Sequence, residues 1–219
     1  MRVVLAWSSG KDSAWTLHAL RRDPRFTVVG LLTTVNALHD RVAMHAVRRR
    51  LLEAQADAAG LPLRVAEIPY PCPNETYEVV MADAVAAMKA DGVEAMAFGD
   101  LFLEDVRRYR ERQMAGTGLE LAFPLWGRST RELAGEMIAG GLRASLTCVD
   151  PRVLPASFAG RAFDDALLRE LPPGVDPCGE NGEFHTFAWD GPMFERAVRC
   201  QPGEVVERDG FVFADLVPQ

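Results

Sequence analysis

A run of polar residues near the amino terminus has the composition of a phosphate-binding loop. It reads Ser8-Ser9-Gly10-Lys11-Asp12-Ser13 and lies between an apolar segment and an amphipathic one. If these are a strand and a helix, the free N–H groups and the positive dipole end of the helix point at the run and attract an anion. Gly10 lets the backbone approach a phosphate closely, and Lys11 adds a full positive charge. We therefore expect Ser8 through Ser13 to hold the phosphates of a nucleotide.

The acidic residue in this run indicates a metal ion. The Walker A pattern fails, because Leu5 stands where its first glycine should be and Lys11 is followed by Asp12. A carboxylate beside a phosphate is unfavourable unless a cation lies between them, so Asp12 predicts Mg²⁺. A second acidic group, Asp100, follows Gly99 after a later apolar run and is expected to share that ion or to orient the substrate. The alternative is a plain β–α turn with a Ser or Asp helix cap.

A second dense motif lies near the carboxyl terminus. It reads Gly179-Glu180-Asn181-Gly182-Glu183-Phe184-His185-Thr186. Glu180 and Glu183 are suited to act as ligands or bases, and His185 can move protons near neutral pH. We expect these three side chains to be catalytic, together with Lys11 and Asp12 of the first motif. A solvated turn is the alternative for the two glutamates, and packing is the alternative for His185.

The arginines of the segment 104–115 are weaker candidates. Arg107 and Arg110 could contact an anionic substrate. Glu104 lies three residues before Arg107, however, and such spacing is also typical of a solvated, salt-bridged helix.

The elements that would position these residues alternate along most of the chain. Apolar or β-branched runs predict strands over Arg2–Trp7, Thr27–Val35, Leu63–Ile68, Val93–Phe98, Glu120–Pro124 and Arg143–Cys148. Amphipathic stretches predict helices over Asp12–Arg22, Asp40–Ala59, Asn74–Ala90, Glu104–Ala115 and Ser129–Ala139. This alternation predicts a doubly wound α/β fold, a mostly parallel sheet with helices on both faces.

Ligands of such sheets bind beyond the carboxyl ends of the strands. The motifs fall in those loops. Thr33-Thr34-Val35-Asn36, read as a polar turn after the second strand, is expected to contact the nucleoside through Thr33 and Thr34.

The texture of the sequence changes after about residue 149. Prolines interrupt the helical patterns, and aromatic or β-branched segments flank Asp209-Gly210, which is a hairpin signal. We expect residues 1–149 to form the nucleotide-binding domain and residues 150–219 to form a smaller α+β portion that binds the substrate.

Composition excludes several classes of protein. The chain has 219 residues, of which 48% are hydrophobic and 25% charged, an ordinary globular balance. A net charge of −7 disfavours general nucleic-acid binding. The four cysteines show no zinc-ligand spacing. With no signal peptide and no apolar run of about 20 residues, we expect a cytoplasmic protein without a membrane segment.

The first motif resembles the S-G-G-x-D-S signature of the PP-loop ATP pyrophosphatases, although Ser9 stands where that signature has glycine. Gly179 through Thr186 resemble the G-E-x-G-E-[FY]-H-T hallmark of the diphthine–ammonia ligase family. The segments 44–48 and 51–56, together with Gly99-Asp100, resemble other parts of that family. The similarity runs from Val3 to about Thr186.

The resemblance implies a function. The phosphate loop would hold the β- and γ-phosphates of ATP as leaving pyrophosphate, while Asp12 and Asp100 hold Mg²⁺. An acceptor carboxylate would attack the α-phosphate, and ammonia would then displace AMP, with Glu180, Glu183 and His185 holding substrate or ammonium. In this family the acceptor is a carboxylate on a modified histidine of a translation elongation factor.

Two alternatives remain open from the sequence. A sulfur-transfer enzyme acting on tRNA would use the same ATP chemistry but would usually add paired cysteines and a basic surface. A nucleotide-sensing protein would bind ATP without turnover. Either way a homodimer is plausible, because α/β enzymes of this kind commonly pair.

Overall fold

The computed structural model describes residues 1–38, 41–42 and 47–219. Its first sheet has six strands, and the expected parallel α/β architecture is confirmed. β1 (Arg2–Ala6), β2 (Thr27–Asn36), β5 (Ala95–Ala97) and β6 (Glu120–Ala122) run in the order β2-β1-β5-β6, all parallel. β4 (Leu63–Ile68) pairs with β2 in parallel, and the short β3 (Arg41–Val42) pairs with the end of β2 in the antiparallel sense.

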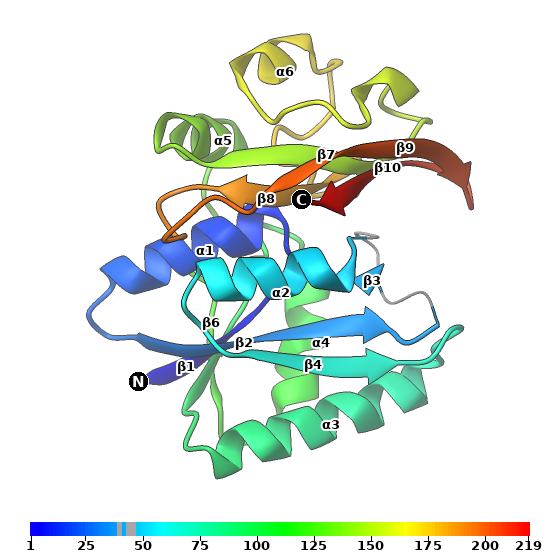
Figure 1. Ribbon diagram of the computed structural model, residues 1–219. Helices are drawn as coiled ribbons and strands as arrows, with labels where there is room; N and C mark the ends of the chain where they lie inside the picture. Colours follow the sequence, from blue (N-terminus) through cyan, green and yellow to red (C-terminus); the bar gives the residue numbers. More distant parts are fainter. Residues whose placement is uncertain (39–40, 43–46) are drawn as a thin grey trace.

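Helices cover both faces of this sheet (Figure 1). On one face, α3 (Asn74–Ala90) and α4 (Glu104–Met114) close an apolar cluster that includes Met81, Met96 and Met114. On the other face lie α1 (Lys11–Arg22) and α2 (Arg49–Ala58), whose Leu17 and Leu51 are fully buried. Burial on both faces explains why the strands are nearly continuous apolar runs.

A second, antiparallel sheet packs on the far side of α1 and α2 (Figure 1). Its strand order is β8-β7-β10-β9, formed by β7 (Arg143–Val149), β8 (Phe184–Asp190), β9 (Cys200–Arg208) and β10 (Phe211–Pro218). Its outer face carries α5 (Thr130–Ala139), a short 3₁₀ turn (Ala156–Phe158) and α6 (Asp165–Glu170). The hairpin predicted at Asp209-Gly210 joins β9 to β10. Residues of this sheet share one core with α1 and α2, so the two layers form a continuous unit.

One predicted strand belongs to a different sheet from the one expected. The run over residues 143–148 was interpreted as another repeat of the parallel α/β pattern, but β7 is antiparallel to β8 and β10. The reason is that an apolar run specifies a buried strand but not the strand that pairs with it. The parallel sheet therefore ends at β6, before α5.

The helix predicted over residues 40–59 is also shorter than expected. Arg41 and Val42 form β3, and α2 begins at Arg49 after an extended Arg48. Arg41 and Arg48 both bind the Asp215 carboxylate of β10, which holds this segment against the second sheet. Residues 44–46, part of the family resemblance, lie outside the described residues.

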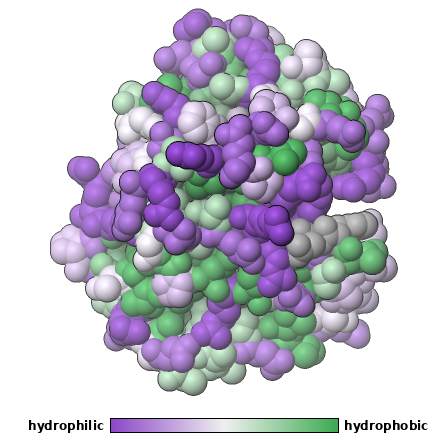
Figure 2. All heavy atoms as spheres, in the orientation of Figure 1, coloured by the Kyte–Doolittle hydropathy of each residue, from purple (hydrophilic) through white to green (hydrophobic). Residues whose placement is uncertain are grey.

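Hydrophilic side chains dominate the upper half of the surface in Figure 2, over the second sheet, and apolar ones are more frequent around α3 and β4. Among the helices of the described residues, none is long and apolar enough to cross a membrane.

Candidate active site

A cavity of ≈ 690 Å³ opens where the carboxyl ends of β1, β2 and β5 meet the first turn of α1. The loop that precedes β8 forms another wall, so both sheets contribute to the cavity. Its volume falls in the range of small-molecule sites in proteins. Most of the side chains singled out in the sequence line it, namely Ser8, Lys11, Asp12, Ser13, Thr33, Thr34, Gly99, Asp100, Arg110, Glu180 and His185.

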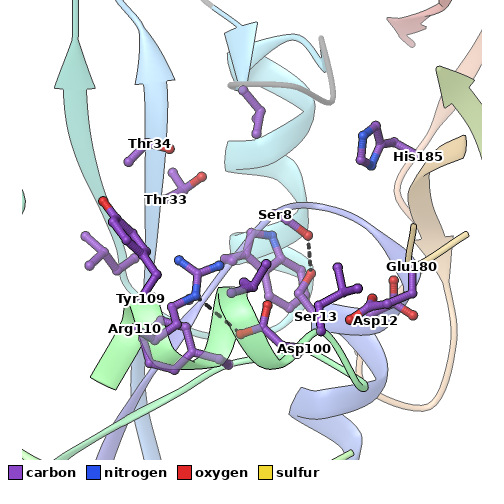
Figure 3. A pocket seen from close by; sticks show the side chains of 18 of the residues that line it. Ser8, Asp12, Ser13, Thr33, Thr34, Asp100, Tyr109, Arg110, Glu180 and His185 are labelled. Atoms are coloured by element: carbon purple, nitrogen blue, oxygen red, sulfur yellow. Dashed lines mark hydrogen bonds and ion pairs between the residues drawn. The ribbon is translucent and has the colours of Figure 1, made fainter. Parts of the chain in front are cut away.

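Polar groups gather on two sides of this cavity (Figure 3). Asp12 and Glu180 lie on one side, at the phosphate loop and the loop before β8. Thr33, Thr34 and Tyr109 lie on the other, at the end of β2 and on α4. This separation suits an elongated ligand whose anionic end reaches the amino terminus of α1.

The phosphate loop is held by its own hydroxyls. Ser8 Oγ donates to Ser13 Oγ at 3.1 Å and accepts from the N–H of Gly10 at 3.3 Å. Ser13 Oγ donates to the Gly10 carbonyl at 3.0 Å, which fixes the first turn of α1. Ser9 has φ 70°, a left-handed conformation that favours glycine. The glycine usual at this position in the signature therefore has a conformational reason, and Ser9 adopts the same backbone at a cost.

Two residues predicted to bind nucleotide do not line the cavity. Ser9 is fully buried behind the loop, and its carbonyl accepts from Gln55 and from the N–H of Ala188. Gly10 caps α1 with its backbone and likewise does not line the cavity. Both residues therefore shape the loop from behind, and their predicted contact with nucleotide remains untested.

A buried glutamine ties the loop to both neighbouring layers. Gln55 of α2 is fully buried; its Nε2 donates to the carbonyls of Ser9 and Ala188 at 2.9 and 2.6 Å. Its Oε1 accepts from the Trp7 indole at 2.9 Å. Gln55 was not among the residues that type or spacing predicted for the site. The only signal was a polar residue within an otherwise apolar helical stripe.

Lys11 joins the two motifs. Its side chain is 2% exposed; the ammonium binds the Asp12 carboxylate at 2.8 Å and the carbonyl of Cys178. It also lies 5.5 Å from the centre of the Phe163 ring and 5.4 Å from that of Phe184. Burial opposes the charge, but Asp12, Cys178 and Glu180 together outweigh burial and raise the pKa of Lys11 above its usual value. The ammonium thus fixes the position of the second loop against the first.

The acidic groups of the cavity are held in a low-dielectric environment. Burial raises the pKa of Glu180 to about 7, although the N–H of Leu101, 2.7 Å away, favours the carboxylate. Burial also raises the pKa of Asp12, which Lys11 opposes. Burial lowers the pKa of His185 to about 4, and the Lys11 charge adds to this, so the imidazole is neutral at pH 7.

Glu183, predicted to be catalytic, does not line the cavity. It is 6% exposed, and its carboxylate accepts from the N–H groups of Asp176 and Asn181 and from the Asn181 amide, at 2.9 to 3.0 Å. Asp176 in turn accepts from the N–H groups of Cys178 and Glu180 at 3.0 Å. Glu183 therefore organises the loop that presents Glu180.

Glycines allow the close approach of the loops. Gly179 has φ 69°, and a Cβ there would lie 2.8 Å from the Phe184 carbonyl oxygen. A Cβ on Gly99 would lie 3.2 Å from the backbone of Asp12 and Ser13. Gly99 thus allows close contact between the β5–α4 loop and α1, and its expected contact with the nucleotide stays a prediction.

The second predicted metal ligand already has a cationic partner. Asp100 is bound by Arg110 Nε at 3.3 Å (Figure 3). The Arg110 guanidinium also stacks on Phe98, 4.7 Å from the centre of the ring. Arg107 lies outside the cavity lining, against Phe123 and Trp126 at 4.8 and 4.7 Å, and pairs with Glu111. Of the two arginines, Arg110 faces the cavity and Arg107 stabilises the adjoining surface.

Thr33 and Thr34 lie within the last part of β2, not in a turn after it, because β4 continues to pair with β2 up to Asn36. Thr33 is 3% exposed. Among the described residues, its hydroxyl and that of Ser9 are buried without a hydrogen-bond partner. Such groups are costly unless a ligand or water satisfies them, and Thr33 lines the cavity.

A parallel α/β sheet with a hydroxyl-rich loop at the amino terminus of its first helix is typical of the PP-loop class of ATP-dependent enzymes. Two family models match the chain: the diphthamide synthase N-terminal domain over residues 1–121 and the C-terminal domain over 129–213. Diphthine–ammonia ligase from Homo sapiens is 27% identical over 99% of this chain and 89% of its own length. The Danio rerio protein of that name is 30% identical over 99% and 92%. The chain belongs to the diphthine–ammonia ligase family.

This membership confirms the family resemblance and the expected enzyme class, a ligase. It supports neither the tRNA sulfur-transfer nor the nucleotide-sensor alternative. The match to the first family model ends at residue 121, in β6, and the match to the second begins at residue 129, just before α5, and the parallel sheet also ends between them. These positions favour a domain boundary there, whereas the boundary expected at residue 149 stays a prediction.

Proposed function

We propose that this protein uses ATP to adenylate an acceptor carboxylate, releases pyrophosphate, and transfers ammonia to form an amide. The observation that carries the proposal is the meeting of the two motifs in one cavity, with Lys11 of the phosphate loop bound to the loop that presents Glu180. The names of the relatives, which specify ligation of ammonia, support the same chemistry.

The triphosphate of ATP lies at the amino terminus of α1, on Ser8, Ser13 and the first-turn N–H groups. The nucleoside extends toward Thr33 and Thr34, where the buried Thr33 hydroxyl gains a partner. Attack by an acceptor oxygen on the α-phosphorus breaks the bond to the bridging oxygen, and pyrophosphate leaves. The fixed positive end of α1 stabilises the charge that develops on it.

The carboxylates present fit a magnesium ion. Mg²⁺ is usually held by one or two carboxylates together with substrate phosphates, and Asp12 and Asp100 line the same cavity. Asp12 pairs with Lys11, and Asp100 pairs with Arg110. Part of each negative charge is therefore already compensated, and only the remainder is available to a metal ion. Bound to phosphate, the metal would neutralise charge on the leaving group.

Glu180 holds the ammonium. Its carboxylate faces the cavity beside Asp12, and its pKa near 7 leaves it largely charged above neutral pH. The Glu180 carboxylate accepts one proton from the ammonium, and the ammonia so formed attacks the carbonyl carbon of the adenylate. The bond to the AMP oxygen breaks, AMP leaves, and the amide nitrogen releases its second proton to solvent. The acceptor carries a carboxylate and is a protein. Neutral His185 lines the wall nearby and is suited to hold the acceptor.

Labelled ammonia tests the proposal. The protein, ATP, Mg²⁺ and ¹⁵N-ammonium are incubated with cell extract freed of small molecules, and macromolecules are analysed by mass spectrometry. We expect ¹⁵N in an amide, lost in Asp12→Asn and retained in the matched control Asp83→Asn, which changes an exposed residue of α3. ATP-dependent labelling that survives Asp12→Asn would refute this assignment of the site.

A further inference from the structure

The outer strand of the second sheet is open on one edge and on both faces. In the described part of the chain, β9 pairs only with β10 and ends the strand order β8-β7-β10-β9 (Figure 1). Its consecutive residues Val205 and Val206 point to opposite faces of the sheet, yet they are 58% and 44% exposed. An open edge with exposed valines favours pairing with another strand.

The hairpin fixes which backbone groups point outward. Asp209 and Gly210 have φ 53° and 81°, so the two-residue turn is of type I′, and Arg208 and Phe211 form the first hydrogen-bonded pair. Hydrogen-bonded and non-hydrogen-bonded pairs alternate along the two strands from that point. Val206 therefore forms a hydrogen-bonded pair with Phe213, whereas the N–H and C=O groups of Val205 and Glu207 point away from β10. Two outward-facing residues thus flank Val206.

We propose that β9 pairs with β9 of a second copy of this chain, antiparallel and centred on Val206, to form one continuous eight-stranded sheet. In this register each Val205 exchanges both backbone hydrogen bonds with Glu207 of the other copy. Glu204 then stands opposite Arg208 of the other copy, in a non-hydrogen-bonded pair where side chains are close. The two-fold axis of this dimer generates the ion pair between Glu204 and Arg208 twice.

Charge selects this register over its neighbours. A centre on Glu207 would place two glutamates directly opposite each other, which is destabilising. A centre on Val205 would extend the pairing into Pro202 and Gly203, where the register of β9 against β10 shifts, and would set no opposite charges against each other. Only the centre on Val206 sets opposite charges against each other while it uses the outward N–H groups.

Arg208 is already placed for this contact. Its guanidinium lies 5.0 Å from the ring of Phe213, on the face that Val206 shares, and its Nε is 3.8 Å from the Asp209 carboxylate. The distance to Asp209 is too long for a strong ion pair, and Arg208 is half exposed. Pro202 lies near the start of β9 and, lacking an N–H, confines the pairing to the outer half of the strand.

The proposal is tested by sedimentation velocity, over a range of protein concentrations, on variants in which the charges at positions 204 and 208 are reversed singly or together. We expect the wild type to dimerise reversibly, and Glu204→Arg to raise the dissociation constant by about tenfold or more, because both cross-strand pairs become repulsive. Arg208→Glu should do the same. The double variant Glu204→Arg/Arg208→Glu restores opposite charges and should restore dimerisation.

Hydrogen exchange gives a second readout. On association the amides of Val205 and Glu207 should gain protection, whereas the amide of Val206, already bonded to β10, should not change. A wild type that stays monomeric at its highest soluble concentration would overturn the proposal. So would a dimer that Glu204→Arg leaves intact, or a double variant that remains as weak as the single ones.

Discussion

The ammonium of Lys11 binds the backbone carbonyl of Cys178, 167 positions later in the chain, and so links the phosphate loop to the loop that carries Glu180. Lys11 also neutralises Asp12. Lys11, which its residue type predicts to bind phosphate, is therefore bound to the Cys178 carbonyl of one loop and to the Asp12 carboxylate of the other. We interpret Lys11 as a positioning residue that keeps the two halves of the site in register.

Lys11→Met should destabilise the protein. Removing one member of a buried pair leaves the Asp12 carboxylate beside an apolar side chain, which costs about 3 kcal/mol. The measurement is the free energy of unfolding from urea denaturation. Lys11→Met/Asp12→Asn, which removes both charges, should recover a large part of the loss. If the double variant is no more stable than Lys11→Met, the pair does not explain the burial of Lys11.

Ser9→Gly should stabilise the protein. Ser9 holds φ 70° and its buried hydroxyl has no partner among the described residues, so glycine removes a backbone strain of about 1 kcal/mol and an unsatisfied group. Ser9→Ala is the matched control, because it removes the hydroxyl and keeps the strain. Urea denaturation should rank Ser9→Gly above Ser9→Ala; the reverse order would mean that the left-handed backbone carries no cost.

Gly179→Ala should damage the site more than Gly182→Ala. Both glycines have positive φ, 69° and 88°, so each alanine costs about 1–2 kcal/mol in backbone strain. Only at position 179 would the new Cβ meet the Phe184 carbonyl, at 2.8 Å, while nothing lies within 4 Å at Gly182. Displacement of Glu180 should then lower ATP turnover by about a hundredfold in Gly179→Ala alone. Equal turnover in the two variants would contradict this account of the loop.

Stability should depend on pH through Glu180. Its pKa is about 7 in the folded protein and about 4.3 in an unfolded chain, so the folded state binds more protons between these values. The stabilisation from the protonated form is complete below about pH 4.3 and is lost as the pH rises to about 7. We expect the unfolding free energy of the wild type, minus that of Glu180→Gln, to fall as the pH rises from 5 to 8. Urea denaturation of both proteins at each pH measures this difference. A constant difference would mean that Glu180 titrates normally.

Local patterns in the sequence predicted most of the elements. Apolar runs and helical spacing located β1, β2, β4 and α3 closely, because the spacing of apolar residues is a property of each segment alone and can be read without knowing its partners. The same signals could not tell that β7 pairs in the second sheet, since pairing is decided by distant residues. They also missed the strand at Arg41–Val42, which pairs with β2 and is accompanied by ion pairs of Arg41 and Arg48 with the distant Asp215.

The candidate site was predictable in composition but not in detail. Loop context brought Ser8, Ser13 and Glu180 together correctly in one cavity. Residue type could not show that Glu183 points into its own loop, because its partners are backbone N–H groups that any sequence offers. Nor could it reveal Gln55, whose carbonyl partners lie 46 and 133 positions away.

Cleavage of ATP between the α- and β-phosphates is the central claim. In the most direct measurement, the protein is incubated with Mg²⁺, ammonium, cell extract freed of small molecules as the source of the acceptor, and ATP labelled with ³²P at either the α- or the γ-phosphate. The labelled products are then separated. We predict labelled AMP from the first nucleotide and labelled pyrophosphate from the second, both dependent on the acceptor and lost in Asp12→Asn. Labelled ADP from the first nucleotide and free phosphate from the second would contradict the account.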